Sequence, residues 1–296
     1  MQSIFVTIVL VVLVAFGNAQ DMPQPGVCGV SAIQPKSSSR IINGEAATPH
    51  SIPFQLLLVA FHENGTSRFY CGASLVKNTH ALTAAHCVDG VDAKNIRLYF
   101  GLHELPKGSF SAAAGTPIRE YFKHESYSSS SLTNDVAVIR LAMPVVVDNI
   151  KVGLICLPPS NAPVCAVGHN VVASGWGSLS GEPNRTSASR PTELQQVALQ
   201  CVDATNSDCR SLTYTLFFVQ DKSKMCAYGE SKGVCFGDSG GPLVRERVTS
   251  DGIVYRELVG IMSGTVDCSL TRPRPDIYAN TIYFSAWILN KIAQSL

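Results

Sequence analysis

The chain has 296 residues, of which 46% are hydrophobic and 15% are charged, so it has the composition of a folded globular protein and not of a disordered chain. Lys and Arg total 23 against 22 for Asp and Glu, which leaves a net charge of +1. This balance provides no long-range attraction to nucleic acid or to an acidic membrane, and we expect neither as a partner.

The first 19 residues have the pattern of a secretory signal peptide. Residues 4–16 form a nearly unbroken apolar run that is too short to span a bilayer comfortably, and Gly17, Asn18 and Ala19 suit signal peptidase. The usual basic residue near the start is missing, so a retained signal anchor is the alternative. We predict a secreted, extracellular protein.

Residues 20–40 are rich in Pro, Gln and Ser, contain one cysteine and end in Arg40, and we interpret them as a linker. From residue 41 onward, short apolar runs alternate with clusters of Gly, Pro and Asn, which is typical of antiparallel barrels or of a sandwich. The predicted strands lie at residues 54–61, 73–76, 96–100, 136–141, 171–173, 197–199, 258–262 and 277–279. A single helix is predicted over residues 283–296 from the spacing of its apolar residues.

Cysteines and sequons agree with an exported protein. There are ten cysteines, an even number, and none forms a C-x-x-C motif, so we expect disulfides and no zinc site. Asn64 and Asn184 begin N-glycosylation sequons, which places both segments at the surface of a secreted chain.

Three segments carry residues suited to nucleophilic chemistry. C-F-G-D-S-G-G-P-L sets Ser239 among glycines, which favours a tight, exposed turn, but a serine hydroxyl needs an adjacent base to attack. T-A-A-H-C offers His86, although a lone histidine beside a disulfide is more often structural. N-D-V-A-V places Asp135 at the mouth of an apolar strand, where a carboxylate needs partners; alone, it would be an ordinary turn aspartate.

The order His86, Asp135, Ser239 with these flanks resembles the chymotrypsin-like (trypsin-fold) serine proteases. The resemblance spans residues 41–296 and includes I-I-N-G-E, T-A-A-H-C, D-V-A-V-I-R-L, G-W-G and G-D-S-G-G-P-L. It implies an all-β fold of two six-stranded antiparallel Greek-key barrels with a C-terminal helix. It also implies a serine endopeptidase in which Ser239 attacks, His86 moves the proton, Asp135 orients the imidazole, and the amides of Gly237 and Ser239 bind the oxyanion.

The resemblance further implies a zymogen. Cleavage after Arg40 by a trypsin-like protease would free an amine at Ile41 that pairs with Asp238, which makes residues 20–40 an activation prosegment. A cysteine before the cut and one in an I-C-L-P segment would keep the prosegment attached. The implied disulfides are Cys28–Cys156, Cys71–Cys87, Cys209–Cys226 and Cys235–Cys268, which leaves Cys165 and Cys201 to pair with each other.

The primary specificity pocket departs from the trypsin pattern. Gly233 stands where trypsin-like members have the aspartate that binds Lys or Arg, and Asp276 stands where the family usually has glycine. This swap is similar to that of crustacean collagenolytic proteases. Either Asp276 enters the pocket and favours basic side chains while apolar ones are tolerated, or it pairs with Arg272 or Arg274.

The segment at the pocket entrance also differs from the family. The segment from Ser263 to Cys268 lacks the usual tryptophan, and we expect Thr265 to narrow the pocket entrance. Residues 102–117 contain no clear pair of acids for the family's calcium loop, so we expect no metal and no cofactor.

The expected partners are protein or peptide substrates and protein protease inhibitors, and the chain is expected to be a monomer. The alternative function is that of a non-catalytic homologue which binds a partner through the same fold. An esterase or lipase triad on an α/β sheet has the chain order Ser, Asp, His, which does not match.

Overall fold

The computed structural model describes residues 22–34, 44–163, 165–179, 190–202, 209, 221–230, 233–265 and 275–295. The predicted signal peptide and the expected cut between Arg40 and Ile41 lie outside these ranges. Within them, no helix combines the length and the apolar character needed to cross a membrane.

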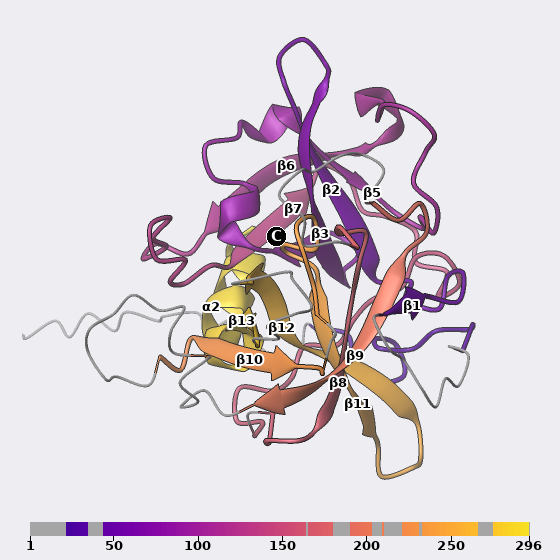
Figure 1. Cartoon of the computed structure of the whole chain (residues 1–296), viewed down its shortest axis with the longest axis vertical. Helices are drawn as coiled ribbons and strands as arrows, with labels where there is room; N and C mark the ends of the chain where they lie inside the picture. Colours follow the sequence, from indigo (N-terminus) through magenta and orange to yellow (C-terminus); the bar gives the residue numbers. More distant parts are fainter. Residues whose placement is uncertain are drawn as a thin grey trace, which may run out of the picture.

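The N-terminal half folds into a closed antiparallel barrel, seen in the upper half of Figure 1. Its strands, in barrel order, are β2 (Gln55–Phe61), β3 (Ser67–Lys77), β4 (His80–Thr83), β7 (Ala137–Leu141), β6 (Thr116–Lys123) and β5 (Ile96–Tyr99). All seven residues of β2 are buried, which explains why its sequence after Gln55 is a continuous apolar run without alternation. Three short 3₁₀ helices lie between strands: η2 (Ala85–Cys87), η3 (Ala93–Asn95) and η4 (Ala112–Ala114).

The C-terminal half forms a second barrel, in the lower half of Figure 1. Its strands are β8 (Asn170–Gly175), β9 (Gln195–Val202), β10 (Lys224–Tyr228), β13 (Asp276–Asn280), β12 (Val254–Gly264) and β11 (Pro242–Val248), and the pairing of β8 with both β9 and β11 closes the ring. The short strand β1 (Glu45–Ala46) adds to β9, and helix α2 (Thr281–Gln294) ends the chain. The predicted fold class is therefore confirmed.

All eight predicted strands overlap observed ones, and α2 begins two residues before the predicted helix. It does so because the side chain of Asn280 caps it, accepting hydrogen bonds from the amides of Ile282 and Tyr283. The sequence pattern missed β1, β4, β6, β10 and β11. β6 and β11 include charged residues, and β4 has only four residues, so their apolar signal is short or interrupted.

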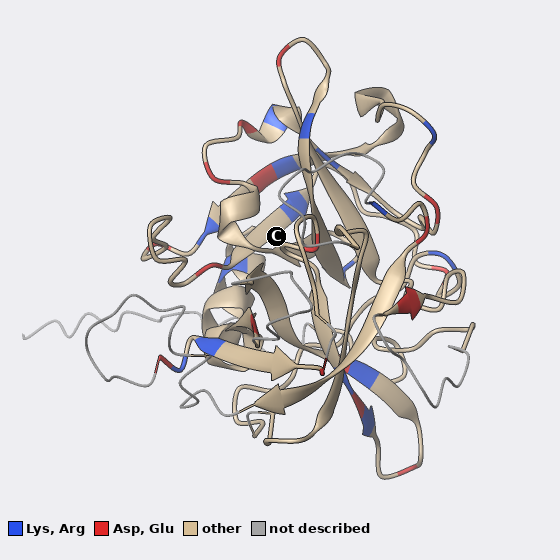
Figure 2. Cartoon of the chain, in the orientation of Figure 1, with Lys and Arg blue, Asp and Glu red and all other residues tan. Residues whose placement is uncertain are grey.

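Charged residues are distributed over both barrels in Figure 2, as the near-neutral balance predicts. Among the residues that the structure describes, one Arg–Glu pair is buried: Arg245 Nε on β11 lies 2.8 Å from Glu257 Oε2, its register partner on β12. Arg245 also donates to the carbonyl of Pro163. These bonds offset the desolvation of two charges.

The two barrels approach closely at the nucleophile loop. A Cβ on Gly72 of β3 would lie only 2.6 Å from the Cα of Gly241, so only glycine fits there. Ser174 Oγ donates to Gln55 Oε1 across the same junction (2.7 Å). Helix α2 contacts β12 of its own barrel and β7 of the first one, which ties the two halves together.

Residues 22–34, the described part of the predicted prosegment, are docked on this body, so the segment is more than a linker. Cys28 is fully buried and is bonded to Cys156. The amide of Gly29 donates to Leu154 O (2.7 Å), and its carbonyl accepts from the amide of Arg256 (2.9 Å). A disulfide and backbone hydrogen bonds therefore both hold the segment.

Candidate active site

Asp135 is buried at the junction of the barrels and accepts three hydrogen bonds. Its Oδ1 accepts from the amide of His86 (2.9 Å), and its Oδ2 accepts from His86 Nδ1 (2.7 Å) and from Ser263 Oγ (2.6 Å). Three donors compensate for the loss of water around a carboxylate that is 1% exposed. The carboxylate assigns the proton to Nδ1 of His86, which leaves Nε2 as the nitrogen able to accept another.

Ser263 was expected in the substrate pocket, and its hydroxyl bonds the Asp135 carboxylate. Sequence reasoning missed this contact because 128 residues separate the two. The only signal was the position of Ser263 at the start of the segment that departs from the family pattern.

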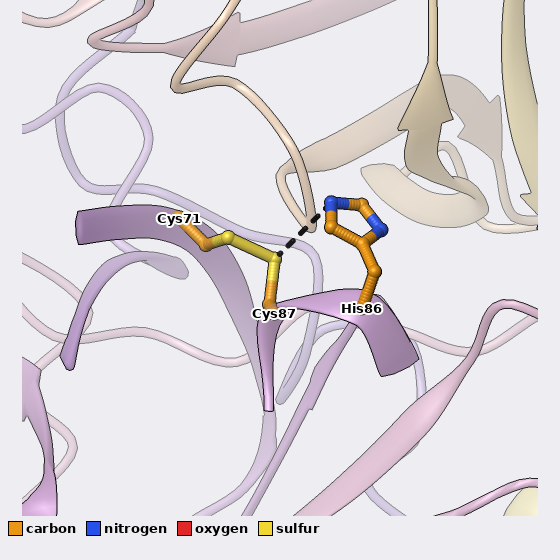
Figure 3. A group of neighbouring side chains, drawn as sticks. All are labelled: Cys71, His86 and Cys87. Carbon is orange, nitrogen blue, oxygen red and sulfur yellow. Dashed lines mark hydrogen bonds between the residues drawn. A yellow bond between two sulfur atoms is a disulfide. The ribbon is translucent and has the colours of Figure 1, made fainter. Parts of the chain in front are cut away.

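A disulfide lies against the other side of the His86 ring. Nε2 is 3.7 Å from Cys87 Sγ, and Figure 3 shows this edge of the imidazole turned toward the Cys71–Cys87 bridge. The donor atoms of Cys71, His86 and Cys87 lie within 4.8 Å of one another, a spacing that would suit a metal ion. Because the two sulfurs are bonded to each other, they cannot act as thiolate ligands. The disulfide instead packs against the imidazole ring.

Ser239 lies in the expected tight turn. Gly240 has φ +77°, and a Cβ there would overlap Thr83 Oγ1 and Gly72 O, which are themselves hydrogen-bonded (2.8 Å). The amide of Gly72 donates to the carbonyl of Ser239 (2.7 Å), which fixes the loop against β3. Between these two described residues, no hydrogen bond joins Ser239 Oγ to His86 Nε2. Catalytic hydrogen bonds are often long or poorly aligned before substrate binds, so the missing bond is compatible with the roles expected of the two residues.

The amides of the loop divide into two sets. Those of Asp238, Gly240 and Gly241 donate to the carbonyls of Cys235, Met262 and Asp238, respectively. For the amides of Gly237 and Ser239, the described residues provide no acceptor. Gly237 has φ +107°, a conformation that side-chain-bearing residues rarely adopt. These two donors, on either side of Asp238 in the sequence, are thus available to a ligand.

Asp238 points away from these donors and into the second barrel. Its carboxylate accepts from the amides of Gly177 (2.8 Å) and Cys235 (2.9 Å), and a Cβ on Gly175 or Gly177 would overlap it. Burial raises the pKa of Asp238 to about 6, although the two backbone hydrogen bonds oppose the shift. The carboxylate borders a cavity of about 40 Å³ that Gly44 also lines.

Asp276, at the start of β13, is 3% exposed. Its Oδ2 accepts from the amide of Val234 (3.0 Å), and the Thr265 side chain is also hydrogen-bonded to the carboxylate. Burial raises the pKa of Asp276 to about 7. Among the described residues no basic side chain pairs with it, and Arg272 and Arg274 lie outside them.

Gly233 lies directly beside the Asp276 carboxylate. A Cβ on Gly233 would lie 3.0 Å from Asp276 Oδ2. A carboxylate at either position can therefore reach the same place, which gives a physical reason for the swap seen in the sequence. Thr265, expected only to narrow the entrance, also contacts this carboxylate.

Four disulfides join the cysteines that the resemblance pairs or leaves over: Cys28–Cys156, Cys71–Cys87, Cys165–Cys201 and Cys209–Cys226. Cys235 is also disulfide-bonded, and its predicted partner Cys268 lies outside the described residues. Asn64 lies in the exposed turn between β2 and β3, and Asn184 is outside the described ranges.

Two antiparallel barrels with a histidine, an aspartate and a serine loop at their junction define the chymotrypsin-like class of serine peptidases. The family model described as Trypsin matches residues 41–288. Trypsin delta and trypsin gamma of Drosophila melanogaster are each 30% identical to the chain over 258 residues, which cover 86% of this chain and 90% of each relative. The chain therefore belongs to the trypsin family of serine peptidases.

Proposed function

We propose that the protein is a secreted serine endopeptidase, made as a zymogen and activated by cleavage after Arg40. The observation that carries the proposal is the His86 imidazole, whose Nδ1 is held by Asp135 while Nε2 is left to take a proton. The apolar N-terminal run and the disulfides support secretion.

In the proposed reaction, Ser239 Oγ attacks the carbonyl carbon of the scissile peptide bond and His86 Nε2 takes the hydroxyl proton. Asp135 stabilises the resulting imidazolium through the 2.7 Å bond to Nδ1. His86 then gives the proton to the leaving amine. Water attacks the acyl-enzyme in the second half of the reaction: His86 takes a proton from the water and passes it to Ser239 Oγ as the acyl group leaves.

The amides of Gly237 and Ser239 are the proposed oxyanion donors. Negative charge develops on the carbonyl oxygen only in the transition state, so donors fixed beforehand lower the barrier, commonly by about 3 kcal/mol each. The positive φ of Gly237 orients the first donor.

Activation is proposed to act through Asp238. Cleavage would create an ammonium group at Ile41, three residues before Gly44. Three residues in an extended chain reach about 10 Å. Gly44 lines the cavity beside the Asp238 carboxylate, so the new amine is within reach of it. The prosegment would remain bound through Cys28–Cys156.

For substrates we propose polypeptides cut after basic residues, with apolar residues tolerated. Asp276 is a carboxylate at a pocket base without a basic partner among the described residues, and Gly233 leaves room beside it. Protein inhibitors would bind in the same pocket.

The test is to cleave the purified protein after Arg40 and measure fluorophosphonate labelling and peptide hydrolysis. Labelling should appear only after cleavage, and it should be lost in Ser239→Ala and stay absent in Arg40→Gln. A cleaved, folded chain that neither labels nor hydrolyses peptides would be a non-catalytic homologue.

A further inference from the structure

An arginine lies over an aromatic ring beside the proposed oxyanion donors. The Cζ of Arg190 is 4.5 Å from the centroid of the Tyr70 ring, and Arg190 is exposed. The position of a Cβ on Gly237 is 3.3 Å from Tyr70 Cε2. The ring therefore borders the nucleophile loop, with the guanidinium above it.

Tyr70 lies on the leaving-group side of the site if the proposed function holds. His86 Nε2 must face the leaving amine to protonate it, and the wall on that side of the ring is the Cys71–Cys87 bridge (Figure 3). Tyr70 directly precedes Cys71 on β3. Asp276 and Gly233, by contrast, form the pocket for the acyl side.

The ring is held in place from its edges. Phe110 packs edge-on against Tyr70, with centroids 6.2 Å apart, and against Tyr99 at 5.3 Å. An arginine over a fixed ring loses less side-chain freedom when it binds, and its planar group matches a carboxylate with two hydrogen bonds. Among the described residues no carboxylate forms an ion pair with Arg190.

We propose that Arg190 and Tyr70 form a subsite which selects an acidic side chain within the first two residues after the scissile bond. The inference rests on the proposed function, because it requires an acyl-enzyme and a leaving peptide. It adds a selectivity that is independent of Asp276: a basic or apolar residue before the cut and an acidic one shortly after it.

Acyl transfer tests this subsite separately from the acyl pocket. The cleaved enzyme is given an ester substrate together with dipeptide amides, whose amine attacks the acyl carbon while Ser239 Oγ leaves and regains its proton from His86. The amides carry Asp, Asn or Lys at the first or the second position. We expect Asp to be favoured over Asn by roughly 5-fold at one position, the effect of one partly exposed ion pair. In Arg190→Ala this ratio should fall to about 1.

Arg119→Ala is the matched control, because Arg119 is an exposed arginine on β6, across the first barrel from β3. It removes the same charge and should keep the 5-fold ratio. Arg190→Lys should keep part of it, since the charge remains without the planar group.

The outcomes separate the two proposals. Absence of ester hydrolysis by the cleaved wild-type chain would overturn the proposed function. Normal ester hydrolysis with no preference for Asp, or with a preference that survives in Arg190→Ala, would overturn the subsite alone.

Discussion

The buried aspartates of the two barrels differ in how many hydrogen-bond donors surround each carboxylate. In the first barrel, Asp135 accepts bonds from a histidine ring, a backbone amide and a serine hydroxyl, so the carboxylate has its partners within the folded chain. In the second barrel, Asp238 and Asp276 have two polar contacts each, and burial raises the pKa of both. Asp135 has its donors within the folded chain, whereas Asp238 and Asp276 are the proposed binding sites for two cations, the new amine at Ile41 and a basic side chain of the substrate.

The number of donors around a buried carboxylate indicates whether it holds a neighbouring side chain in place or can bind a cation. A carboxylate fully provided with donors holds a histidine in one orientation and need not change. A buried carboxylate with few donors can bind a positive charge, because the cation replaces the favourable interaction with water that the carboxylate lost on burial. We infer that the second barrel places regulation and specificity on its two incompletely compensated acids.

Asp135→Asn should have the largest effect on catalysis. The amide can keep the shape of the site but presents a donor to Nδ1, which favours the wrong tautomer of His86, and we expect kcat to fall by roughly 10⁴-fold. Hydrolysis of a peptide substrate by the cleaved variant measures it. Asp92→Asn is the control, since Asp92 is an exposed acid in the same barrel. A loss below 10-fold would contradict the assigned role of Asp135.

Asp238→Asn should change the pH dependence of stability in the uncut chain. Because the folded pKa of Asp238 is about 6 and its ordinary value is 3.8, its protonated form favours folding. This contribution is complete below about pH 4 and is lost as the pH rises toward 6. Urea unfolding should show that Asp238→Asn stabilises the uncut chain by roughly 2 kcal/mol more at pH 7.5 than at pH 4.5.

The control for this experiment is Asp251→Asn, which removes an exposed acid from the turn between β11 and β12. It should show no such pH-dependent gain. After cleavage the sign should reverse for Asp238, because the new ammonium stabilises the carboxylate and Asn cannot replace that pair. Equal effects of Asp238→Asn before and after cleavage would refute docking of the Ile41 amine on Asp238.

Asp276→Gly should have a smaller and selective effect. Without the carboxylate, cleavage after Lys or Arg should fall by roughly 10-fold relative to cleavage after Leu or Phe, measured as kcat/KM over matched peptides. If the ratio did not change, Asp276 would not contact the substrate.

The double variant Gly233→Asp/Asp276→Gly sharpens this test. Because the two positions address the same space, the transplanted carboxylate should restore most of the preference for basic residues. Loss of the preference for basic residues in the single variant, together with its recovery in the double variant, could not result from unfolding.

Short motifs determined much of this protein. The flanks of His86, Asp135 and Ser239 predicted the family, and the resemblance to that family implied the two-barrel fold and three of the four observed bridges, leaving Cys165 and Cys201 for the fourth. Apolar runs located eight strands because burial in a barrel demands them. These features are local, so a sequence carries them directly.

The tertiary structure decided what depends on residues that are far apart in the chain. The bond from Ser263 to Asp135, the contact of Thr265 with Asp276 and the placement of Arg190 over Tyr70 leave no local pattern. The shortage of donors around Asp238 was equally invisible, because the free energy of a buried charge is set by its whole surroundings. Only folding, which brings both barrels to one junction, determines those surroundings.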